Sequence, residues 1–214
     1  MNEFGTTYTT RFFTPTEKQL EAHNSPETFV LFGGGIGAGK TTWLCAEAIQ
    51  MSLDYPGNVG YLCSKYYDFL IGNRQATFDK LLGKIECVHC PIEQRYLFEN
   101  GSKIFYGGTN ENDRWRIMAM ELGWLGIDNV NSITEKEEQH LNEEDIFSMM
   151  CYRLQLRYKV YPHKSFPYKV FLTSYPGNGW FKDRFVTNKL SDHAFIDGSI
   201  SPFEGSLKNE HNTY

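Results

Sequence analysis

Residues 29–42, FVLFGGGIGAGKTT, decide the fold of this chain of 214 residues. An apolar run of β-forming residues is followed by a glycine-rich loop and by a segment that forms a helix. Gly34, Gly39, Lys40 and Thr41 have the spacing of a P-loop, in which backbone N–H groups surround phosphate oxygens, the lysine reaches the β- and γ-phosphates and the threonine hydroxyl binds Mg²⁺. The following helix adds the positive end of its dipole. This stretch predicts a site for ATP and Mg²⁺; the alternative is a glycine-rich turn that binds nothing.

The composition favours one globular domain. Hydrophobic residues make up 41% of the chain, which is enough for one buried core. The net charge of −5 gives no overall basic field, so contact with nucleic acid has to come from a local patch. Five cysteines at irregular spacing favour a reducing compartment over a disulfide framework. The sequence has no signal peptide and no apolar run long enough to span a membrane, so we expect a soluble protein of the cytoplasm.

Predicted strands and helices alternate along the chain. Thr14 as N-cap and Pro15 at the first helical position predict a helix start before the P-loop strand. After the P-loop helix, residues 59–63 predict a second strand and residues 69–82 a second crossover helix. The alternation predicts an α/β fold, a P-loop NTPase with a mainly parallel central sheet flanked by helices.

The two ends of the chain differ from its middle. Residues 1–11 are polar, rich in threonine and without periodicity, which predicts an N-terminal arm. The residues after 195 have the character of a tail. We therefore expect an arm over residues 1–11, a P-loop ATPase domain over 12–195 and a C-terminal tail or linker over 196–214.

A β-hairpin is predicted over residues 93–106. Asn100-Gly101 has the composition of a two-residue hairpin turn, and β-forming residues flank it. Just before the hairpin, Cys87 and Cys90 have the Cys-x-x-Cys spacing of zinc ligands, but no second Cys or His pair follows at a suitable distance. We interpret these two residues as ordinary cysteines.

A second strand that carries catalytic chemistry is predicted at residues 122–127. This apolar run ends in Asp128, as a Walker B strand does when it places its carboxylate beside the Mg²⁺ held by Thr41. Another apolar strand ends in Thr173 and Ser174, and polar groups at that end are placed to sense the γ-phosphate. The separation of Thr41 and Asp128 in sequence suits a sheet with an additional strand between the two Walker strands.

The residue after Asp128 is Asn129. A glutamate that polarises the attacking water is common at this position, and an asparagine amide cannot accept a proton. Other carboxylates in the neighbourhood are Glu121, Glu135, Glu137 and Glu138. Intrinsic hydrolysis is therefore expected to be weak.

Two residues outside these motifs are further candidates. Gln19 lies on the helix before the P-loop strand, and its amide can bind both the donor and the acceptor edge of adenine; a solvated glutamine is an equal alternative. Arg74 is either a surface residue or a charge supplied to the nucleotide of a neighbouring subunit, and Arg114 and Arg116 are the next candidates for that role.

The predicted site residues form three sets. The catalytic set is Lys40, Asp128, Asn129 and Arg74. The metal set is Thr41 and Asp128. The nucleotide-binding set is Gln19, Gly34, Gly35, Gly37, Ala38, Gly39, Lys40, Thr41, Thr42, Thr173 and Ser174.

Taken together, these segments resemble the ATPase domain of the large terminase subunit, the DNA-packaging motor of tailed bacteriophages. The resemblance extends over residues 12 to about 185. It is carried by Phe12 to Gln19, the P-loop, the hairpin leading to Tyr106-Gly107-Gly108, the Gly-Trp segment at 121–128, Arg153-Leu154, and Thr173 to Trp180.

The resemblance implies a motor that hydrolyses ATP to drive double-stranded DNA into a procapsid in the host cell cytoplasm. It implies a homo-oligomeric ring that docks on the portal protein, with the small terminase subunit as a partner and an arginine acting in trans. Family members also carry a C-terminal nuclease domain, for which this chain leaves no room, so we expect an isolated motor domain that is mostly monomeric. The chain departs from the family at Asn129 (usually Glu), Tyr175 (usually Asn) and Ile36 (often Arg).

Two other functions compete with this interpretation. Because Asn129 removes the expected base, the chain could be a nucleotide-binding module with little hydrolysis. A different P-loop nucleic-acid motor, such as a helicase, is the third hypothesis, and the chain has no further helicase-like segments in its favour.

Overall fold

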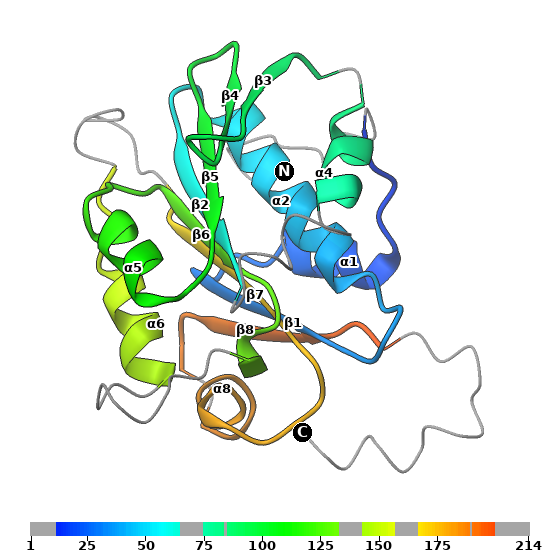
Figure 1. Ribbon diagram of the computed structural model, residues 1–214. Helices are drawn as coiled ribbons and strands as arrows, with labels where there is room; N and C mark the ends of the chain where they lie inside the picture. The colour runs from blue at the N-terminus through cyan, green and yellow to red at the C-terminus, as the bar shows by residue number, and fades with distance from the viewer. Residues whose placement is uncertain are drawn as a thin grey trace.

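The computed structural model describes residues 12–64, 75–83, 85–132, 143–156, 167–188 and 190–199. Within them, one eight-stranded sheet has the order β3-β4-β5-β2-β6-β7-β1-β8 (Figure 1). The strands are β1 (Phe29–Gly33), β2 (Val59–Cys63), β3 (Cys87–Cys90), β4 (Arg95–Phe98), β5 (Lys103–Gly107), β6 (Trp124–Ile127), β7 (Lys169–Ser174) and β8 (His193–Asp197). The helices are α1 (Glu17–His23), α2 (Lys40–Asp54), α4 (Gln75–Leu82), α5 (Glu111–Met118), η2 (Val130–Ser132), α6 (Glu143–Cys151), α8 (Trp180–Lys182) and η3 (Asp183–Thr187).

The predicted α/β fold is confirmed, and so is the additional strand. β7 lies between β1, which leads into the P-loop, and β6, which ends before Asp128. β1 pairs in parallel with both β7 and β8, and β6 pairs in parallel with β7. The carboxyl ends of these strands therefore meet at one edge of the sheet, which is where open α/β sheets bind their ligands.

Helices cover both faces of the sheet (Figure 1). Successive side chains of β1 point to opposite faces of the sheet. Val30 and Phe32 pack in the core under α1, α2 and α4, and Leu31 packs in the core under α5, α6 and α8. Strands that are covered on both faces have continuous apolar sequences, and residues 29–32 and 124–127 are of this kind. Trp43 of α2 and Trp124 of β6, both fully buried, are large side chains of the first core.

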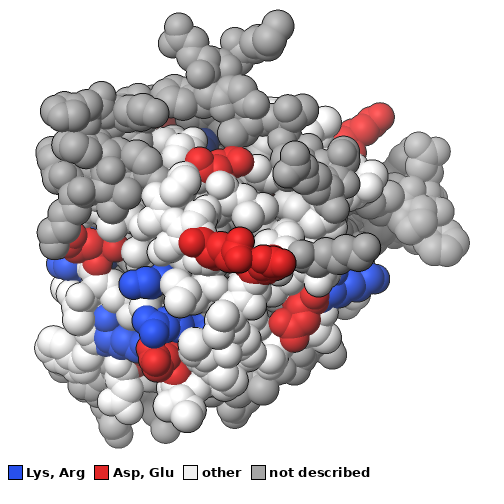
Figure 2. All heavy atoms as spheres, turned by 90° about the horizontal axis from the view of Figure 1, so that it is seen from above, with Lys and Arg blue, Asp and Glu red and all other residues white. Residues whose placement is uncertain are grey.

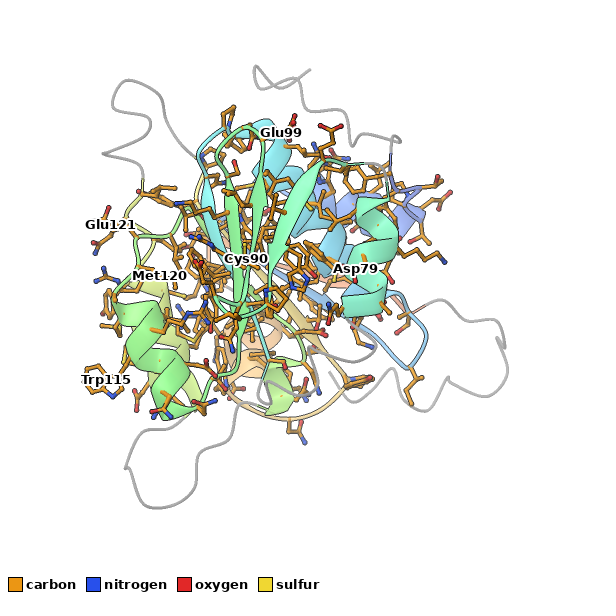
Figure 3. The ribbon with its side chains drawn as sticks, turned by 45° about the horizontal axis from the view of Figure 1, so that its top comes forward. Asp79, Cys90, Glu99, Trp115, Met120 and Glu121 are labelled. Atoms are coloured by element: carbon orange, nitrogen blue, oxygen red, sulfur yellow. The ribbon has the colours of Figure 1, made fainter. Side chains whose placement is uncertain are left out.

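The predicted hairpin is confirmed, but the length of its turn was wrong. Pairing of β4 with β5 is antiparallel, and the N–H of Phe98 donates to the carbonyl of Ser102 at 2.9 Å. The loop thus contains three residues, Glu99 to Gly101, rather than two, and Gly101 takes the left-handed backbone (φ 83°) that such loops require. Figure 3 labels Glu99 at the tip of this hairpin.

A third strand that the sequence did not predict extends the hairpin. β3 pairs antiparallel with β4 and contains both Cys87 and Cys90. Because successive side chains of a strand alternate between faces, residues three apart lie on opposite faces of the sheet. The Cys-x-x-Cys spacing is therefore part of a strand at the edge of the sheet.

Two element boundaries differ from the sequence-based expectation. Helix α1 begins at Glu17 with Thr16 as its N-cap, two residues later than predicted, because the side chains of Thr16 and Gln19 form a capping box. β8 spans His193–Asp197 and pairs with β1, so the sheet continues across position 195, where we had ended the ATPase domain. None of the helices in the described parts of the chain is long and apolar enough to cross a membrane.

Candidate nucleotide-binding site

The loop between β1 and α2 has the backbone of a phosphate-binding loop. Gly39 is the N-cap of α2 in the left-handed conformation (φ 74°), and no side chain caps the helix. The first N–H groups of this helix of 15 residues thus face the loop without a side-chain acceptor, which is the arrangement that favours an anion. A residue with a Cβ would be strained at the φ of Gly39, and its Cβ would lie 2.6 Å from Nε2 of Gln19, so the side chain of Gln19 would have to move. Gly37 is also left-handed (φ 82°).

Lys40 lies at the start of α2, and only 7% of it is exposed. Its Nζ donates to the carbonyl oxygens of Gly34 (2.7 Å) and Gly35 (2.6 Å). Burial lowers the pKa of the Lys40 ammonium from its ordinary value, while the nearby Asp128 carboxylate acts in the opposite direction. A buried ammonium beside a loop of N–H groups can compensate the charge of phosphate groups.

Thr41, Asp128 and Thr173 form one hydrogen-bonded group. The Thr41 hydroxyl donates to Oδ2 of Asp128 at 3.0 Å. The Thr173 hydroxyl donates to Oδ1 of the same carboxylate and accepts from the N–H of Asn129 at 2.8 Å. Asp128 is 3% exposed and Thr173 is fully buried. The structure thus brings together residues from α2, β7 and the end of β6.

This group has the donor chemistry that Mg²⁺ requires. A carboxylate and hydroxyl oxygens are hard ligands, and a cation held by one carboxylate keeps positions for water and phosphate oxygens. The residues that would hold Mg²⁺ are Asp128 and Thr41. Such a cation would neutralise phosphate charge.

Asn129 has a left-handed backbone, with φ 60°. Asparagine adopts this conformation more readily than other residues with a Cβ. The carboxylates that could substitute for a base here are not brought to Asp128 within the described residues: Glu121 precedes β6, at the opposite end of the strand, and points outward near α5 (Figure 3). Glu135, Glu137 and Glu138 lie outside the described residues.

Gln19 is hydrogen-bonded to the backbone of the P-loop. Its Nε2 donates to the carbonyl of Gly39 at 3.1 Å, and its Oε1 accepts from the N–H of Thr16 at 2.8 Å. Both ends of the amide are thus bound within the protein, and the residue is 4% exposed. Adenine recognition by Gln19 stays a prediction. It would require the amide to exchange these two hydrogen bonds for hydrogen bonds to the base.

The remaining predicted residues fall into three groups. Gly34, Gly35 and Ala38 belong to the loop, and Thr42 lies half-buried in the first turn of α2. Ser174 is the last residue of β7, paired in register with Gly33 and fully buried. Arg74 lies outside the described residues.

The sequence singled out Tyr175 as a departure from the family, but it predicted neither the contact of Tyr175 with Lys40 nor the part of Asn131, which binds the backbone of Tyr175. The ring of Tyr175 lies over Nζ of Lys40, with 4.0 Å between the nitrogen and the ring centroid. The side-chain amide of Asn131 donates to the carbonyl of Tyr175 (2.9 Å) and accepts from its N–H (3.0 Å). The only signals in the sequence were the position of Tyr175 directly after a strand and its departure from the Asn that is usual in the family; nothing pointed to Asn131.

Comparison with known proteins gave matches among solved structures alone. No protein-family model and no curated protein matches the sequence. The large terminase of a thermophilic bacteriophage superposes with a TM-score of 0.66 at 16% identity, over 87% of this chain and 46% of that chain. That protein has also been solved with ATP-γ-S and with ADP.

Two further structures have the same architecture. The large terminase ATPase domain of Thermus phage P74-26 matches with a TM-score of 0.61 at 16% identity, over 88% of this chain and 82% of that domain. The N-terminal domain of the DNA-packaging ATPase of bacteriophage phi29 matches with a TM-score of 0.55 at 14% identity, over 87% and 95% of the two chains. The chain spans less than half of the large terminase of the thermophilic bacteriophage. It shares the fold of the ATPase domains of phage DNA-packaging motors.

Proposed function

We propose that this chain is the ATP-hydrolysing motor domain of a machine that packages double-stranded viral DNA into a procapsid. The observation that carries the proposal is the meeting of Lys40, Thr41 and Asp128 at the carboxyl edge of a sheet whose fold is that of phage packaging ATPases. Binding of ATP-γ-S and hydrolysis of ATP by the purified chain, each with and without Mg²⁺, test it. A chain that does not bind ATP-γ-S would overturn it.

In the proposed mechanism each residue has one task. The N–H groups of the loop and of the α2 N-terminus bind phosphate oxygens, and Lys40 compensates the charge on the β- and γ-phosphates. Asp128 and Thr41 hold the cation, which supplies further neutralisation when it is bound. Thr173 fixes the Asp128 carboxylate through its hydroxyl, so the site is preorganised before ATP arrives.

Asn129 favours a second candidate function, a nucleotide-binding module with little hydrolysis. Its side chain cannot take a proton from the attacking water. Single-turnover hydrolysis measured on the isolated chain and on an associated ring separates the two candidates. A motor should become faster on association, whereas a binding module should bind ATP-γ-S and remain slow in both states.

A ring of subunits with an arginine in trans completes the proposal. Arg74 is the first candidate, since Arg114 is buried and the Arg116 guanidinium donates to the backbone of Glu93 and Gln94. An arginine supplied in trans contributes about 10³- to 10⁵-fold in kcat in related phosphoryl transfers. Mixing Arg74→Ala chains with Lys40→Ala chains at high concentration should restore activity, because each supplies what the other lacks at one interface. A mixture as inactive as its parts, under conditions where wild-type chains turn over, excludes Arg74.

The partners in this proposal are duplex DNA, the portal protein and the small terminase subunit, in the host cytoplasm. Figure 2 shows acidic and basic side chains on the same face, and the chain has a net charge of −5. DNA contact therefore has to come from a local group of basic residues, and its affinity should fall with salt in proportion to the few phosphates neutralised.

A further inference from the structure

Lys40 is held by the protein itself on two sides. Its Nζ donates to the carbonyls of Gly34 and Gly35 at 2.7 and 2.6 Å, and the ring of Tyr175 lies over the same nitrogen at 4.0 Å from the centroid. A phosphate oxygen bound by this ammonium would approach to about 2.8 Å. The ring of Tyr175, the two carbonyl oxygens and the phosphate oxygens would thus compete for the three N–H donors of one ammonium group.

The backbone of Tyr175 is itself fixed. The amide of Asn131 binds both the N–H and the carbonyl of Tyr175, at 3.0 and 2.9 Å. Asn131 lies in η2, which follows Asp128 after a single intervening residue. A change in the position of Tyr175 is therefore transmitted directly to the segment that follows the Asp128 carboxylate.

We propose that Tyr175 and Asn131 form a latch that holds Lys40 against the P-loop in the nucleotide-free protein and that opens when phosphate groups take the ammonium. This inference rests on the proposed function, because it assigns Lys40 to the phosphates. A charge-assisted hydrogen bond to phosphate is stronger than an interaction between an ammonium and a tyrosine ring, so nucleotide displaces the ring at a cost in affinity. Tyr175 acts through Lys40 and is a positioning residue.

The first test is the affinity for ATP-γ-S, measured by isothermal titration calorimetry. Tyr175→Ala should bind about three- to tenfold more tightly than the wild type, because the competing ring is gone. Tyr175→Phe keeps the ring and should bind as the wild type does. Asn131→Ala releases the backbone of Tyr175 and should also tighten binding, and the double variant should gain little more than Tyr175→Ala alone.

A matched control removes a tyrosine elsewhere. Tyr152 follows α6 and is 74% exposed, whereas Tyr175 is 40% exposed. Tyr152→Ala should leave the affinity unchanged. Because both tyrosines are at the surface, thermal unfolding should show that the variants remain folded. Unchanged or weaker binding by folded Tyr175→Ala overturns the latch.

The second test needs no nucleotide. Acylation of the Lys40 amine by a small amine-reactive reagent is followed by peptide mass spectrometry, with the exposed Lys18 as internal reference. Tyr175→Ala should speed the modification of Lys40 by about threefold or more, while Tyr175→Phe and Tyr152→Ala should not. Equal rates in Tyr175→Ala and the wild type overturn the inference.

The two tests also distinguish the latch from the proposed function. If the wild type binds no ATP-γ-S, the proposed function fails, and with it the displacement by phosphate. The acylation rates still decide whether Tyr175 holds Lys40.

Discussion

The hydroxyl of Thr41 donates a hydrogen bond of 3.0 Å to Oδ2 of Asp128, across 87 positions of sequence. This bond joins the P-loop helix, which follows β1, directly to the end of β6, although β7 lies between β1 and β6 in the sheet. The two predicted metal ligands are therefore already in contact. Thr173, from the intervening β7, binds the other oxygen of the same carboxylate.

Thr173→Val should destabilise the protein by about 1–3 kcal/mol, because it leaves a buried carboxylate oxygen and the N–H of Asn129 without the hydroxyl that now serves both. Thr173→Ser retains the hydroxyl and should cost clearly less. Urea unfolding followed by circular dichroism measures both variants. Equal stabilities of the Val and Ser variants would show that the hydroxyl is not needed.

Lys40→Ala should reduce ATP turnover by about 10²-fold or more, since it removes the buried ammonium assigned to the β- and γ-phosphates. Lys18→Ala removes an exposed lysine of α1 and serves as the control. Steady-state phosphate release is the measurement. Unchanged turnover by Lys40→Ala would contradict the assignment of the P-loop.

The titration of Lys40 should appear in the dependence of stability on pH. Burial lowers the pKa of this ammonium below 10.5, so between the lowered pKa and 10.5 the unfolded chain binds more protons here than the folded chain. The free energy of unfolding contributed by this group therefore rises with pH in that interval. Relative to Lys40→Met, the wild type should gain stability as pH increases from neutral towards 10.5. Denaturant unfolding at stepwise pH measures the difference, and a falling difference would contradict the sign.

The left-handed backbone of Asn129 predicts a difference between two small substitutions. Both Asn129→Gly and Asn129→Ala remove the amide, but alanine places a Cβ at φ 60°. The alanine variant should be less stable than the glycine variant by about 1 kcal/mol. Thermal unfolding compares the two directly, and equal midpoints would mean that the backbone at this position relaxes.

Asn129→Glu tests whether a base is missing after Asp128. A glutamate there could polarise the attacking water, for an increase of about 10²-fold in single-turnover hydrolysis. The same substitution should lower stability, because glutamate tolerates the left-handed conformation poorly. If the rate stays flat in a variant that remains folded, another group already activates the water.

The P-loop and the Asp128 strand could be predicted from the sequence because their signals are local. Glycine spacing fixes the loop, and an apolar run followed by a carboxylate marks the strand end. The helix start was misplaced because two threonines flank Pro15, although Gln19 at the third helical position is the mark of the capping box at Thr16.

The contacts around Lys40 could not be predicted, for a different reason. Asn131 and Tyr175 are 44 positions apart, and they meet only because β6 and β7 are neighbours in register. Hydrophobic periodicity indicates where strands lie along the sequence, but it does not indicate their order in the sheet. β8 was missed because polar residues, His193 and Asp197, stand at its two ends, which leaves a central apolar run too brief to show a strand pattern.

The position of β8 also sets the order in which the chain can complete its fold during synthesis. β1, which leads into the P-loop, is made long before its two neighbours, β7 and β8, and β8 is the last strand of the described residues. Until the ribosome has released Asp197, β1 has an open edge, and unpaired edges are where nascent chains associate wrongly. The glycine-rich loop that follows β1 is thus translated well before β8. The strand that positions this loop gains its last pairing partner only when β8 has been made.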